Sequence, residues 1–87
     1  MKTVEIGKVS VDSGQIMIAD PCYLDSLSDD YYENVCAATE QGAGNAKMFT
    51  HFGMAVVTRT AYGDGLYPVK AEMNDSGTIL RLIIDFD

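Results

Sequence analysis

Basic residues are scarce in this chain of 87 amino acids, which has six lysines and arginines against 13 acidic residues and a net charge of −7. Nucleic-acid duplexes and anionic membrane surfaces both repel such a charge unless a basic patch overcomes it. No apolar run reaches the roughly 18 residues that would indicate a membrane span. The composition therefore argues against a duplex-binding or membrane protein, and it leaves open a basic protein partner, a metal ion or a small ligand.

Cysteine is also rare. Cys22 and Cys36 are the only two in the sequence, and their spacing matches neither a CxxC motif nor a zinc site. The first residues lack the apolar segment of a signal peptide. We therefore expect a cytoplasmic protein in which both thiols are reduced.

Hydrophobic residues make up 47% of the sequence, and the length allows one domain over residues 1–87 with a small core. Apolar alternation and turn residues predict an α+β fold, in which one helix packs on an antiparallel sheet of five or six strands. An N-terminal hairpin and a C-terminal three-stranded meander supply the strands. The expected strands are 3–11, 15–19, 54–61, 66–73 and 78–86.

Three turns and one helix connect these strands. Asp12-Ser13-Gly14, Gly63-Asp64-Gly65 and 74–77 carry the residues that favour chain reversal. The helix is expected over 28–41, with Cys36 on its packed side. Residues 41–47 are rich in glycine and alanine and are expected to form a loop. A small sheet with one covering helix leaves edges and part of a face exposed, so we also expect a homo-oligomer.

Two groups of residues are candidates for catalysis or metal binding. Converging aspartates could hold a hard cation or act as a general acid and base, although turn chemistry alone explains three of them and no EF-hand pattern is present. Cys22 with His51 could form a thiolate nucleophile and its base, although no local signature supports the pair. We expect neither a metal nor a cofactor. The aspartates are Asp12, Asp20, Asp64, Asp75 and Asp85.

A third group could bind an anion. If the turns at 63–65 and 74–77 close hairpins, strand alternation places Arg59, Lys70 and Arg81 in one cross-strand row. Like charges that face one another destabilise a sheet, so the row needs either acidic neighbours or an anionic ligand. Tyr62 and Tyr67 flank the first turn and could stack on a flat ligand. The predicted ligand site is Arg59, Lys70, Arg81, Tyr62, Tyr67 and Asp64, and the acidic neighbours available are Glu5, Glu72 and Asp85.

Two stretches carry a family resemblance. The segment Val11-Asp12-Ser13-Gly14 followed by Asp20-Pro21-Cys22-Tyr23 resembles a VDSG…DPCY pattern of small uncharacterised bacterial and phage proteins. The segment 63–69, followed by 75–77 and 84–86, is similar to the GDGxYPV…DxG…DF ending of a bacterial family of unknown function. The resemblance implies a phage or bacterial protein in the cytoplasm of a bacterial host cell, and it implies no catalytic residue.

These observations predict a non-enzymatic binding protein rather than an enzyme. The expected ligand is small and anionic, for example a nucleotide or a cyclic nucleotide signal that a phage anti-defence protein would sequester. Two alternatives stay open. One is a small hydrolase-like enzyme that uses Cys22 with His51 or the aspartates, and the other is an acidic inhibitor that binds a protein.

Overall fold

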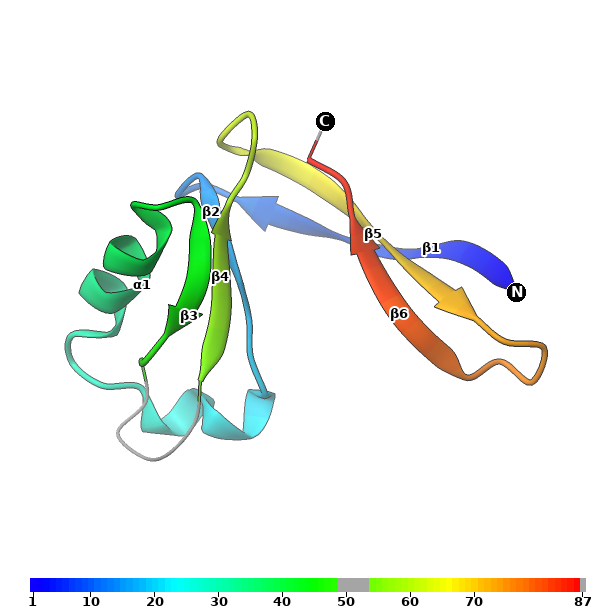
Figure 1. Ribbon diagram of the computed structural model, residues 1–87, viewed down its shortest axis with the longest axis horizontal. Coiled ribbons are helices and arrows are strands. Elements are labelled where there is room, and N and C mark those ends of the chain that lie inside the picture. Colours follow the sequence, from blue (N-terminus) through cyan, green and yellow to red (C-terminus); the bar gives the residue numbers. More distant parts are fainter. Residues whose placement is uncertain (49–53, 87) are drawn as a thin grey trace.

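The fold combines two small antiparallel sheets with one α-helix (Figure 1), in a computed structural model that describes residues 1–48 and 54–86. The strands β1, β5 and β6 form the arm sheet, and β2, β4 and β3 form the helix-covered sheet. The α+β prediction is confirmed, but the prediction of one sheet with five or six strands is wrong. In chain order the elements are β1 (Lys2–Val11), β2 (Gln15–Ile18), the 3-10 helix η1 (Pro21–Ser26), α1 (Tyr31–Thr39), β3 (Ala43–Ala46), β4 (Ala55–Arg59), β5 (Gly65–Met73) and β6 (Ile79–Ile84).

A kinked two-stranded ribbon joins the two sheets. The predicted N-terminal hairpin is wrong, because β1 pairs with β5 whereas β2 pairs with β4. Val11 pairs with Gly65 on one side of the bend, and Gln15 pairs with Arg59 on the other. The two segments of the ribbon therefore stay side by side through the bend. Neither 12–14 nor 60–64 reverses the chain. Each is a kink at which one strand of the ribbon leaves one sheet and enters the other.

Hydrogen bonds at Thr60 hold the kink together. The Thr60 amide donates to the Gly14 carbonyl over 3.0 Å, and the Thr60 hydroxyl also contacts the carbonyls of Gly14 and Gly63. Gly14 has a φ of +72° and Gly63 a φ of +80°, which glycine adopts without the strain that other residues incur. Glycine at these positions thus allows either a hairpin turn or a bend. The strand pairing on both sides of residues 12–14 and 60–64 makes each of them a bend.

The core lies between α1 and the helix-covered sheet. Val35 from α1 meets Ala46, Met48, Ala55 and Val57 in one buried cluster. The helix ends at Thr39, and Gly42, with a φ of +104°, turns the chain back into β3. The loop predicted over 41–47 is therefore wrong in part. Its small residues have low strand propensity, but pairing with β4 and packing under α1 make a strand of 43–46.

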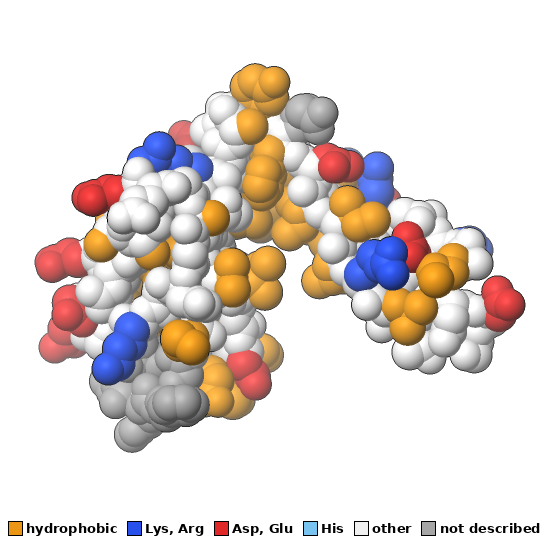
Figure 2. Space-filling view, viewed as in Figure 1, with side chains coloured by type: hydrophobic (Ala, Val, Ile, Leu, Met, Phe, Trp, Pro, Cys, Tyr) orange, Lys and Arg blue, Asp and Glu red, His pale blue; other side chains and the backbone are white. Residues whose placement is uncertain are grey.

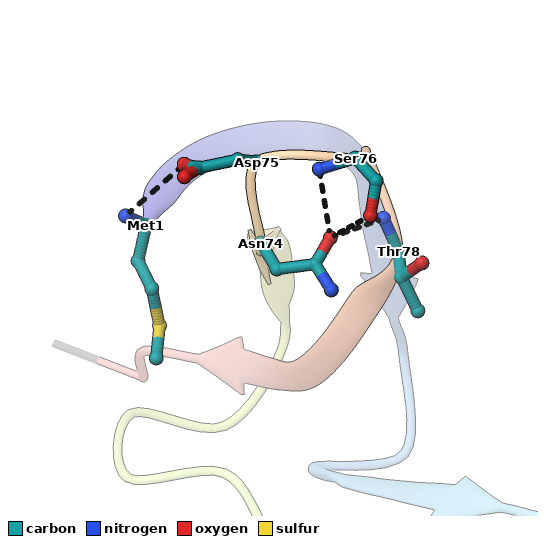
Figure 3. Close-up of polar contacts among 5 residues, drawn as sticks. All are labelled: Met1, Asn74, Asp75, Ser76 and Thr78. Atoms are coloured by element: carbon teal, nitrogen blue, oxygen red, sulfur yellow. Dashed lines mark hydrogen bonds and ion pairs between the residues drawn. The ribbon is translucent and has the colours of Figure 1, made fainter.

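The far end of the arm sheet is closed by the predicted turn at 74–77, which is confirmed (Figure 3). The Asn74 side-chain oxygen accepts hydrogen bonds from the amides of Ser76 and Thr78 at 3.1 and 3.0 Å, and also one from the Ser76 hydroxyl. The N-terminal ammonium lies 4.0 Å from Asp75. An asparagine that bonds local backbone amides is typical of such turns, which is why this hairpin follows from the local sequence.

Candidate functional site

The predicted row of three basic side chains is not formed. Arg59 lies in the helix-covered sheet, whereas Lys70 and Arg81 lie in the arm sheet. Within the arm sheet Lys70 is opposite Ile83, and Arg81 is opposite Glu72. The predicted place of Arg59 in the row is therefore wrong, because the ribbon bends at 60–64 and does not close a hairpin there. The prediction that Lys70 and Arg81 are directly opposite one another is also wrong.

Lys70 and Arg81 do share one face of the arm sheet, and acidic neighbours compensate both. The Lys70 ammonium lies 3.7 Å from Asp85, and the Arg81 guanidinium lies 2.9 Å from Glu72. The sequence analysis predicted that the basic side chains need either acidic neighbours or an anionic ligand, and the structure shows acidic neighbours. The register adds Lys8 to the same face, diagonal to Lys70. The sequence pattern missed Lys8, because it gave no sign that β1 pairs with β5.

The other predicted ligand residues do not form one site, because each has a different environment. The Arg59 guanidinium donates to the Glu40 carbonyl over 2.8 Å. Tyr67 is buried, with its hydroxyl on the Gly63 carbonyl at 2.7 Å and its ring edge-on to Phe86. Tyr62 is 75% exposed, as expected for a residue in the kink. Since one ring is buried and the other is in solvent, Tyr62 and Tyr67 do not form a stacking platform beside the exposed Asp64.

No three of the aspartates converge within the part of the chain that the structure describes. Asp20 accepts a hydrogen bond from the Cys22 amide and so caps η1, Asp75 pairs with the N-terminus, and Asp85 pairs with Lys70. Among residues 1–48 and 54–86, no group of three His, Cys, Asp or Glu side chains is placed to hold a metal ion. Local turn, cap and pair chemistry accounts for these three carboxylates.

Cys22 is exposed at the start of η1, and both cysteines are free. Local desolvation, then the hydrogen bond to Asp20 and its negative charge, raise the pKa of the Cys22 thiol above the ordinary value of 9.0. A higher pKa lowers the fraction of thiolate, which is the nucleophilic form. His51 lies outside the described residues. The environment of Cys22 is thus the reverse of the electropositive setting that activates a catalytic cysteine.

We expect iodoacetamide to alkylate Cys22 slowly at pH 8, with a rate that is still rising at pH 9.0, because the thiolate fraction keeps growing until the pH passes the raised pKa of the thiol. Asp20→Asn removes the nearby charge and should increase the rate at pH 8. Peptide mass spectrometry of the alkylated protein measures this, and the half-buried Cys36 serves as the internal reference. Rapid alkylation of Cys22 at pH 7 would contradict the assignment.

One pocket of about 220 Å³ opens between β2 and α1. Its wall combines two tyrosines from the start of the helix with the edge of the sheet. Tyr31 and Tyr32 lie edge to face with ring centres 6.4 Å apart, and they are 37% and 52% exposed. No hydrogen bond joins either hydroxyl to another described residue. The lining residues are Ser13, Gln15, Ile16, Met17, Tyr31, Tyr32 and Val35.

Internal hydrogen bonds fix the polar side of this pocket. The Gln15 side-chain oxygen Oε1 accepts from the Thr39 hydroxyl at 2.7 Å, and the side-chain nitrogen Nε2 lies 3.6 Å from the Cys36 sulfur. Ser13 donates to the Gln15 carbonyl over 3.3 Å. The pocket is therefore a pre-formed, mostly apolar hollow whose polar edge is already oriented.

The part of the chain that forms the pocket carries an excess of unpaired negative charge. Residues 12–63 hold seven acidic side chains and two basic ones, and none of the seven forms an ion pair within the part of the chain that the structure describes. Asp12, Asp30 and Glu33 are close neighbours in sequence of the pocket residues. Figure 2 shows acidic side chains gathered along the outer edge of the molecule on the α1 side. The pocket thus lies in a negative field.

Neither a protein-family model, nor a curated protein, nor a solved structure matches this chain. The resemblance to phage and bacterial proteins consequently stays a prediction. No helix within the described ranges is long and apolar enough to cross a membrane.

Proposed function

We propose that this protein is a non-enzymatic binding protein whose acidic, helix-covered part takes up a basic segment of a protein partner. The tyrosine pocket between β2 and α1 is the observation that carries the proposal. Its volume is below the 300–1,000 Å³ or so of pockets for drug-sized ligands, so one long side chain fits it better than a whole small molecule does.

A lysine or arginine side chain is the best match to the chemistry of this pocket. Its aliphatic stem would contact Met17 and Val35, and its cationic head would lie against Tyr31 and Tyr32. Cations are attracted to tyrosine ring faces by about 0.5–2 kcal/mol, depending on desolvation. Unpaired carboxylates in this part of the chain favour the same charge and repel anions. The acidic protein-binding inhibitor is therefore the alternative that the site supports best.

A small anionic ligand, such as a nucleotide, is the second candidate. Lys70 and Arg81 support it, because their side chains are 41% and 58% exposed and share the polar face of the arm sheet with Lys8. Exposed ion pairs contribute only about 0–1 kcal/mol, so a phosphate could displace Asp85 and Glu72. The acidic neighbours would still weaken binding, which ranks this candidate below a basic segment.

Fluorescence anisotropy with a labelled peptide rich in lysine and arginine tests the leading proposal. We expect Tyr32→Ala to weaken binding by about 3- to 10-fold through loss of the cation–aromatic contact. Tyr62→Ala is the matched control, because Tyr62 is an exposed tyrosine in the kink and does not line the pocket. Binding should also weaken as salt is raised, since exposed charges are screened beyond about 10 Å at 0.1 M.

Two results would contradict the leading proposal. One is an equal affinity for a peptide that carries glutamate in place of lysine and arginine, and the other is an equal loss of affinity in Tyr32→Ala and Tyr62→Ala. Calorimetry with mononucleotides and cyclic dinucleotides tests the second candidate. Binding there that disappears in Lys70→Ala and Arg81→Ala would favour the anionic ligand.

A further inference from the structure

The arm sheet has one face that carries its ion pairs and one face that is apolar except for Lys2, which lies opposite Met73 near the far end of the sheet. Directly paired residues project from the same side of a sheet, so the pairings Val4–Ala71–Leu82 and Val69–Ile84 place these side chains together. The opposite face carries the ion pairs of Lys70 and Arg81. We call the side without ion pairs the apolar arm face, and it consists of Val4, Val69, Ala71, Met73, Leu82 and Ile84.

No helix in the described part of the chain covers the apolar arm face. Figure 1 shows the arm sheet extending away from α1 with no helix over either side. Leu82 is 53% exposed, and Val4, Val69, Met73 and Ile84 are half-buried, whereas the small Ala71 in the central strand is buried. An open three-stranded sheet with a single packed layer is an unusual end state, because a sheet face of this composition is stable when a second layer covers it.

The surface area of the chain exceeds that of a typical monomer by the area of one interface. The chain exposes 5966 Å², whereas a monomeric protein of 9.5 kDa exposes about 5,000 Å². The excess of about 900 Å² is close to the roughly 800 Å² that each partner buries in a standard interface. The radius of gyration of 14.3 Å likewise exceeds the value of about 12 Å for a compact chain of this length.

Charge is distributed so that two arm sheets can meet. Residues 1–11 and 64–87 hold four basic and six acidic side chains, against two and seven in residues 12–63. The arm is therefore nearly neutral, and the surplus of negative charge lies in the helix-covered part. Packing two arms together keeps the acidic parts apart, whereas packing two helix-covered parts together would oppose like charges.

We propose that a second copy of this chain covers the apolar arm face, so that two arm sheets pack face to face as a six-stranded sandwich about a two-fold axis. Such an interface is isologous, and every residue of it appears twice. Sheets stack about 10 Å apart with interdigitated side chains, which would bury Leu82 and Ile84 of both copies. The tyrosine pocket is on the other sheet and stays accessible, so this inference is independent of the proposed function.

Sedimentation equilibrium at about 50 µM tests the proposal, with the dissociation constant as the readout. The full chain should have twice the 9.5 kDa monomer mass. Leu82→Glu should raise the dissociation constant by about 100-fold or more, because each dimer loses two apolar contacts and gains two buried charges. Leu66→Glu is the matched control, since Leu66 is an arm leucine that is 61% exposed on the face that carries the ion pairs, and it should leave the dimer intact.

Circular dichroism of both variants checks folding, and Leu82→Thr replaces Leu82→Glu if the latter does not fold. A second readout needs no variant: the melting temperature of the full chain should rise with protein concentration, as it does when folding is coupled to association. A monomer mass at about 50 µM with a melting temperature independent of concentration would overturn the proposal. So would a dimer that Leu66→Glu dissociates as readily as Leu82→Glu does.

Discussion

Met48→Ala should lower the free energy of unfolding by about 2–5 kcal/mol, the range for removing a fully buried large side chain. Met48 is 0% exposed and packs with Val35, Ala46, Ala55 and Val57. The cluster is small, so few neighbouring side chains can move in to fill the space. A chain of this length has only about 4–13 kcal/mol of stability in total, and the substitution therefore removes a large share of it.

Urea unfolding followed by circular dichroism measures this loss, at equal protein concentrations so that association contributes equally. Met54→Ala is the matched control. It removes the same atoms from a side chain that is 62% exposed, and it should change the free energy by less than about 0.5 kcal/mol. Equal losses in the two variants would show that the buried cluster does not hold this fold together.

Tyr67→Ala should destabilise the junction of the two sheets by about 3–4 kcal/mol, a magnitude typical of deleting a buried aromatic side chain. Tyr67 is 8% exposed, its ring meets Phe86 edge-on at 5.6 Å, and its hydroxyl bonds to the Gly63 carbonyl in the kink. The structure thus gives this tyrosine a structural role at a position where the sequence suggested a ligand.

Two further variants separate the contributions at this junction. Tyr67→Phe keeps the ring and removes the hydrogen bond, so it should cost about 1 kcal/mol. Tyr62→Ala removes an exposed ring from the same kink and should leave the unfolding midpoint unchanged. If Tyr67→Ala left stability intact but abolished binding of a nucleotide, the ligand role predicted from the sequence would be restored.

Local chemistry predicted most elements of this fold. The strands at both ends, a helix and the turn at 74–77 follow from alternation, apolar spacing and an asparagine that bonds its own backbone. The helix, expected over 28–41, is shorter and spans Tyr31–Thr39. Two elements were missed. β3 has little strand propensity of its own, and η1 depends on a cap at Asp20, which the sequence analysis considered only for metal binding or catalysis.

Predictions that depended on which strands pair were wrong. Asp12-Ser13-Gly14 and Gly63-Asp64-Gly65 suit a hairpin and a kink equally well, because glycine at positive φ serves both. A hairpin at 63–65 would place Arg59 beside Lys70, whereas the observed kink puts the two residues in different sheets. The tyrosine pocket had no strong local signal either, although Tyr31 and Tyr32 next to Asp29 and Asp30 could have directed attention to the start of the helix.

Composition and local sequence patterns are enough to establish the α+β class of this protein and its excess of negative charge. These properties depend on composition and on contacts between residues close together in the chain. The folded chain was needed to show that β1 and β2 belong to different sheets, that acidic partners compensate Lys70 and Arg81, and that no helix covers one face of the arm. The physical reason is that strand register is a long-range property. It is set by the sum of many weak contacts across the sheet, and no single segment encodes it.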